Sequence, residues 1–106
     1  MSVIRLNETN FDNETSTGTT LVDFYADWCM PCRRLSPVLD SVAETLTGTA
    51  TVAKVNIDES PQIAQKFGVK SVPTLILIRD GEVVNRKIGG GNEKQLLDLV
   101  GSGRTN

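Results

Sequence analysis

Cys29 and Cys32 are the only cysteines of this 106-residue chain, and they lie three positions apart. Side chains at that spacing on a helix are about 5–6 Å apart, and a disulfide needs Cβ atoms about 3.5–4.5 Å apart. A small local adjustment would therefore close a disulfide ring. Trp28 and Pro31 frame the pair. The spacing indicates a dithiol that exchanges electrons with other thiols and disulfides.

Spacing alone leaves two other interpretations of the cysteines open. Free cysteines are common in protein cores, so the pair could be structural. A closed zinc site normally needs four Cys or His ligands, and the chain has two cysteines and no histidine. A zinc site would therefore need two copies of the chain. Two cysteines this close cannot form the disulfide framework of a small secreted fold.

The cysteines stand where a strand pattern ends and a helical pattern begins. Residues 20–26 are apolar, β-branched and aromatic, as in a strand buried on both faces. From Pro31 onward, apolar residues recur at spacings of four and three, which predicts a helix. Cys29 thus falls at a helix N-terminus, where free N–H groups and the helix dipole favour a thiolate. We expect Cys29 to attack a substrate disulfide, and Cys32, one turn further in and more buried, to resolve the mixed disulfide.

Two charged residues interrupt apolar runs. Asp23 lies in the middle of residues 20–26, and Lys54 lies in the middle of residues 50–57. A buried carboxylate is costly unless it is paired or neutral, so burial would raise the pKa of Asp23 and let it exchange a proton with Cys32. The alternative is an edge strand with Asp23 in water. Lys54 either faces solvent or lies beside Asp23 and partly offsets its desolvation.

The remaining patterns predict alternating strands and helices. Pro73 precedes an apolar run, and the residues alone do not indicate whether its peptide bond is cis or trans. Asp80-Gly81 is typical of a hairpin turn, and Asn92 of a helix cap. We expect strands at residues 3–6, 20–26, 50–57, 74–78 and 83–88, helices at 9–13, from 31, at 61–67 and after 92, and a frayed tail at 101–106. This order predicts one α/β domain, residues 1–106, with a mixed central sheet and helices on both faces.

Composition excludes several classes of function. Apolar residues make up 39% and charged residues 23%, as in an ordinary globular domain, and the net charge is −2 without a basic run. We therefore expect neither nucleic-acid binding nor a membrane span. The first residues lack the basic and apolar regions of a secretory signal, so we expect a cytoplasmic protein, although a processed mature form would look the same.

Taken together, these landmarks resemble the thioredoxin family. The resemblance covers nearly the whole chain, from about Val3 to Val100, with its landmarks in the family's order and spacing. They are residues 21–26 (LVDFYA), Trp28, Cys29, Pro31, Cys32, Pro37, residues 53–58 (AKVNID), residues 72–74 (VPT), Gly81 and Gly89.

The resemblance implies a thioredoxin fold, with a five-stranded mixed sheet flanked by four helices. It implies a protein-disulfide reductase with Cys29 as nucleophile, Cys32 as resolving thiol, Asp23 as buried acid and Lys54 as its neighbour. Pro73 would be a cis-proline facing the disulfide, and the Val72 backbone would pair with an extended client peptide. The apolar rim that docks clients would consist of Trp28, Met30, Pro31, Val72, Pro73, Gly89 and Gly90.

The resemblance also implies partners. A thioredoxin reductase would supply electrons, disulfide-containing proteins would be the clients, and the chain would hold no cofactor or metal. We expect a monomer. Other functions remain open: a redox-independent binding module, a disulfide isomerase or oxidase, and a soft-metal carrier using two thiolates. The missing secretory features and the missing histidine argue against an isomerase or oxidase.

Met30 departs from the family pattern, because the family usually has glycine between the first cysteine and the proline. Methionine carries no charge, so we expect a reducing poise. Met30 also adds an adaptable apolar contact at the rim, so we expect it to change client or reductase preference more than the intrinsic chemistry. Tyr25 stands where the family often has tryptophan, which leaves Trp28 as the only indole.

Overall fold

The computed structural model describes residues 2–102 of the chain. Strands and helices follow one another in the predicted order. The elements are β1 (Ile4–Leu6), α1 (Phe11–Thr15), β2 (Thr19–Tyr25), α2 (Met30–Thr45), β3 (Thr51–Asn56), α3 (Pro61–Lys66), β4 (Thr74–Arg79), β5 (Glu82–Ile88) and α4 (Glu93–Ser102).

The strands of the described residues form one mixed sheet in the order β1-β3-β2-β4-β5. β3 runs parallel to both β1 and β2, whereas β4 runs antiparallel to β2 and β5 antiparallel to β4. Asp80 and Gly81 both have positive φ angles, 51° and 86°, as the tight turn of the β4–β5 hairpin requires. The predicted mixed sheet is therefore confirmed, and β2 lies at its centre.

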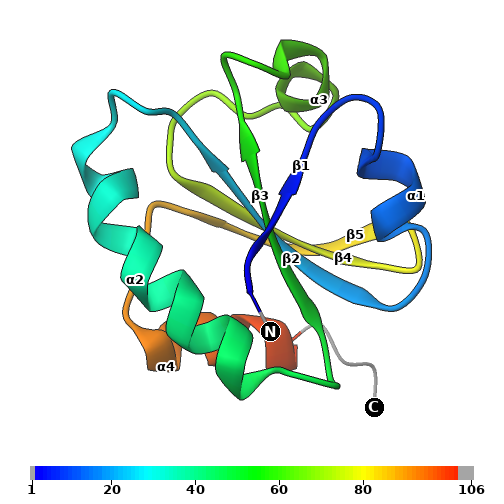
Figure 1. Cartoon of the computed structure of the whole chain (residues 1–106), viewed down its shortest axis with the longest axis vertical. Helices are drawn as coiled ribbons and strands as arrows, with labels where there is room; N and C mark the ends of the chain where they lie inside the picture. The colour runs from blue at the N-terminus through cyan, green and yellow to red at the C-terminus, as the bar shows by residue number, and fades with distance from the viewer. Residues whose placement is uncertain (1, 103–106) are drawn as a thin grey trace.

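Helices cover both faces of the sheet, because β2 alternates its side chains between two cores. Leu21 packs with the apolar faces of α2 and α4, whereas Val22 and Phe24 pack with α1 and α3. Figure 1 shows α2 and α4 together, apart from α1 and α3. Asp23 is in phase with Leu21, so β2 directs it toward the face that α2 covers. The alternation of this one strand thus decides where the carboxyl group lies.

Several element boundaries differ from those expected. The first helix occupies Phe11–Thr15, two residues later than predicted. α4 begins after Asn92, whose Oδ1 accepts a hydrogen bond from the Gln95 N–H at 2.8 Å, so the predicted cap is confirmed. Of the tail expected to fray, Gly101 and Ser102 belong to α4, and residues 103–106 lie outside the described residues. None of the helices in the described range is long and apolar enough to cross a membrane.

Candidate redox site

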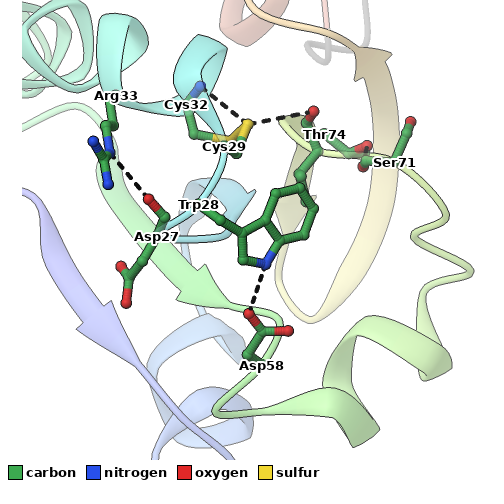
Figure 2. The surroundings of a disulfide bond; sticks show 9 residues. Asp27, Trp28, Cys29, Cys32, Arg33, Asp58, Ser71 and Thr74 are labelled. Carbon is green, nitrogen blue, oxygen red and sulfur yellow. Dashed lines mark hydrogen bonds between the residues drawn. A yellow bond between two sulfur atoms is a disulfide. The ribbon is translucent and has the colours of Figure 1, made fainter.

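The end of β2 and the start of α2 position the cysteine pair. Cys29 is the N-cap residue of α2, and Pro31 occupies its first turn. The two cysteines form a disulfide, with their Cα atoms 5.2 Å apart (Figure 2). The backbone N–H of Cys32 points at the Cys29 Sγ, with the nitrogen 3.2 Å from the sulfur. Backbone N–H groups at a helix N-terminus stabilise a negative charge on sulfur, and this N–H is placed to do so at Cys29.

Both cysteines are equally buried, each with 5% of its surface exposed. The expectation that Cys32 would be the more buried is therefore wrong. The segment before β4 packs against the first cysteine, and the Val72 carbonyl oxygen lies 3.7 Å from the Cys29 Sγ. This segment comes from far along the chain, so it covers Cys29 as effectively as the helix covers Cys32.

Asp23 is buried at the centre of the sheet and lines the same cavity as Cys32. Its residue is 2% exposed, and β2 has neighbours on both sides, which rules out the edge-strand alternative. Burial raises its pKa from 3.8 to about 7, and the positive charge of Lys54 offsets part of that rise. Its Oδ1 has no hydrogen-bond partner among residues 2–102. Such a carboxyl group can gain or lose a proton near neutral pH.

Lys54 lies beside Asp23 rather than pointing away from it. The two residues are register partners on parallel strands β3 and β2. Both line a cavity of about 290 Å³ that also reaches Cys32. The Lys54 Nζ lies 5.3 Å from the centre of the Tyr25 ring, within the range of a cation–π contact. Asp23, Lys54 and Cys32 thus line one cavity.

Pro73 precedes β4, and the Val72–Pro73 peptide bond is cis, as the resemblance implied. The Pro73 carbonyl accepts a hydrogen bond from the Gly89 N–H at 2.8 Å, and the Thr74 hydroxyl donates one to the Ser71 carbonyl at 2.7 Å. These bonds hold the segment and the end of β5 together next to the disulfide.

Comparison with known proteins agrees with this geometry. The family model described as Thioredoxin matches residues 2–102. The chain belongs to the thioredoxin family. It is 39% identical to the thioredoxins of Staphylococcus saprophyticus and Staphylococcus haemolyticus and 36% identical to that of Staphylococcus aureus. Each match extends over 100 residues, 94% of this chain and 96% of the relative. The fold is the thioredoxin fold, and the chain is a thiol–disulfide oxidoreductase whose vicinal cysteines support disulfide reductase activity.

The residues expected to form an apolar rim differ in their exposure in this thioredoxin-family chain. Trp28 is 66% exposed and Met30 56% exposed, and Pro31 is also exposed. Val72, Gly89 and Gly90 are half-buried, and Pro73 is buried. Trp28, Met30 and Pro31 thus offer surface to a partner, whereas Pro73 offers little of its own.

Two residues at the rim had no assigned part in the sequence-based site. Ile88 is 70% exposed and precedes Gly89 at the end of β5. Asp58 accepts a hydrogen bond from the Trp28 indole N–H at 3.0 Å, as Figure 2 shows. An apolar residue directly before the glycine run was a usable signal for Ile88. The Trp28–Asp58 pair joins positions 30 residues apart, so no local pattern could indicate it.

The described residues also bear on metal binding. Within residues 2–102, no group of three or more His, Cys, Asp or Glu side chains is placed to hold a metal ion.

Proposed function

We propose that this chain is a single-domain, monomeric, cytoplasmic protein-disulfide reductase that a thioredoxin reductase recharges and that holds no cofactor. The observation that carries the proposal is the placement of Cys29 at the N-cap of α2, with the Cys32 N–H directed at its sulfur. A cysteine held in this way reacts as a thiolate near neutral pH.

The exchange proceeds in two steps. The Cys29 thiolate attacks one sulfur of a client disulfide, the client S–S bond breaks, and the second client sulfur leaves as a thiolate. The Cys32 thiol then loses its proton and attacks the Cys29 sulfur. The mixed disulfide breaks, the first client sulfur leaves, and Cys29 and Cys32 become the oxidised pair. Two electrons pass to the client, which takes up two protons.

Asp23 serves the second step by accepting the proton of Cys32. A carboxyl group with a pKa of about 7 suits that exchange, because it is neither permanently ionised nor permanently neutral at cellular pH. The shared cavity offers room for a water molecule between the two groups. Lys54 keeps the pKa of Asp23 from rising further.

Clients dock on the rim formed by Trp28, Met30, Pro31, Val72, Pro73, Gly89 and Gly90. Its exposed apolar side chains support this proposal, since such patches mark binding surfaces. An extended client segment would pair with the Val72 backbone as an added strand does. This mode explains how one small surface serves many clients, because main-chain pairing is independent of sequence.

A redox titration tests the proposed function. Trp28 is the only tryptophan and neighbours Cys29, so its fluorescence reports the disulfide. We expect one two-electron transition, at a potential below about −230 mV, the most reducing value typical of glutaredoxins. The Cys32→Ser variant, which cannot close the ring, should give none. A clearly more oxidising transition would favour an isomerase or oxidase, and no transition at all would favour a binding or metal-handling protein.

Met30 should govern partner preference rather than intrinsic chemistry. Met30 is 56% exposed, and burying its side chain against a partner would contribute about 1 kcal/mol to the binding free energy. We therefore expect Met30→Gly to change kcat/KM with clients or reductase about fivefold at a nearly unchanged potential. Met30→Leu keeps the apolar surface and helix propensity, and should behave as the parent does. A large shift in potential with unchanged kinetics would contradict this assignment.

A further inference from the structure

A second hollow lies beside the disulfide, separate from the Asp23 cavity. It has a volume of about 190 Å³ and is lined by Pro31, Arg34, Leu35, Gly90 and Gly91. The first three residues fall at spacings of three and four on α2, so they share one face of the helix. The glycines form the opposite wall, and Pro31 and Gly90 also belong to the proposed docking rim.

The glycine wall is made of backbone alone. A Cβ at Gly90 would lie 3.5 Å from the Leu35 Cδ1, and one at Gly91 would lie 2.8 Å from the Gln95 Oε1. A Cβ at Gly90 would thus make ordinary contact, whereas one at Gly91 would require the Gln95 side chain to shift. Within residues 2–102 the N–H groups of Gly90 and Gly91 have no hydrogen-bond partner.

Arg34 gives the hollow a positive charge. The residue is exposed, and within the described chain its guanidinium group makes no ion pair or hydrogen bond. Its neighbour Arg33 differs, because the Arg33 Nε donates to the Asp27 carbonyl at 3.0 Å (Figure 2). A free guanidinium fork matches the geometry of a carboxylate and can donate two hydrogen bonds to it.

Two acidic residues lie at or next to Trp28, which precedes the cysteine pair, whereas Arg34 follows it. Asp58 lies against the Trp28 indole, and Asp27 precedes it in the chain. An acidic side chain of a bound peptide would be repelled there and attracted at Arg34.

We propose that the hollow between α2 and the glycine run is a subsite for an aspartate or glutamate side chain near the reacting cysteine of a client polypeptide. Arg34 is then a specificity residue and takes no part in the exchange itself. This inference rests on the proposed function, since the occupant belongs to a disulfide-bearing client.

Disulfide-linked peptide dimers test the subsite. The probes carry Glu, Gln or Lys two residues before or after the cysteine, and kcat/KM for their reduction is measured at low and high salt. We expect one Glu peptide to react about three- to fivefold faster than its Gln counterpart, with the Lys peptide slower, and high salt to reduce the difference. Arg34→Gln should remove the preference and leave reduction of the Gln peptide unchanged.

Two further variants complete the test. Arg79→Gln removes the same charge at the far end of β4 and should retain the preference. Gly90→Ala places a methyl group in ordinary contact with Leu35 and Pro73, so the fold tolerates it while the hollow narrows. It should weaken the preference. Equal rates for all peptides, or a preference that survives Arg34→Gln, would overturn the subsite alone. Failure of the parent to reduce any peptide would overturn the proposed function and the subsite with it.

Discussion

Replacing Cys29 with serine should abolish the reduction of protein disulfides, whereas replacing Cys32 with serine should stop the reaction halfway. Serine is not a nucleophile toward disulfides at neutral pH, so Cys29→Ser loses turnover by about 10³-fold or more, the scale seen when a nucleophile is removed. Cys32→Ser keeps the attacking thiolate and accumulates a covalent client adduct. Reduction assays and mass spectrometry of the mixed disulfide measure the two outcomes.

The two variants are matched controls for each other, because each replaces one sulfur atom and each prevents the Cys29–Cys32 disulfide. Equal burial of the two cysteines does not favour either as the attacking residue. The assignment depends instead on the N-cap position of Cys29 and on the N–H that Cys32 directs at its sulfur. A stable client adduct of Cys29→Ser, formed through Cys32, would reverse the two roles.

Asp23→Asn should stabilise the oxidised protein at pH 8 by about 4 kcal/mol, because each pKa unit corresponds to 1.36 kcal/mol and the rise spans about three. Burial raises the pKa of Asp23 from 3.8 to about 7 in the folded state. Between these values the folded protein holds a proton that the unfolded chain has lost, so the parent loses stability as pH rises through this window. Above about pH 7 the loss is complete, and below about pH 4 it is absent.

Urea unfolding at pH 4, 6 and 8 measures this dependence. The gain of Asp23→Asn should grow from near zero at pH 4 to its full value at pH 8. The Lys54→Met variant should change the stability in the opposite direction. Removing the positive charge raises the pKa of Asp23 further, so the variant should lose stability at high pH. A gain for Asp23→Asn that is the same at every pH would mean that packing, not ionisation, causes it.

Periodicity predicted the order of the elements well, because each strand or helix buries a face that its own spacing defines. Boundaries were less accurate where side chains compete for the backbone. The Asn7 Oδ1 accepts hydrogen bonds from the N–H groups of Thr9 and Asn10, and the Asn10 Oδ1 accepts one from the Asn7 N–H. These bonds fix a turn through residues 7–10 and delay α1 until Phe11.

The sequence predicted those features of the site that depend on neighbouring residues. It did not predict those that depend on contacts with distant segments of the chain. The N-cap position of Cys29 follows from the strand and helix patterns on either side of it. The burial of Cys29 and the hollow at Arg34 depend on the segments around residues 72 and 90, which are distant in the sequence. The isomer of the Val72–Pro73 bond came from the family resemblance, because the residue types alone do not fix it.

The outer strand of the sheet has a consequence for self-association. Among the described residues β5 has one strand neighbour, and Val83 and Val84 on it are exposed, so its free edge can pair with a strand of another chain. Its pairing with β4 shifts register between Leu77 and Ile78, and the strand carries charged side chains at Arg86 and Lys87. Bulges and lysines on an edge strand oppose its pairing with the edge strand of another molecule. The molecule can thus expose apolar side chains near its disulfide while its edge strand resists strand-to-strand aggregation.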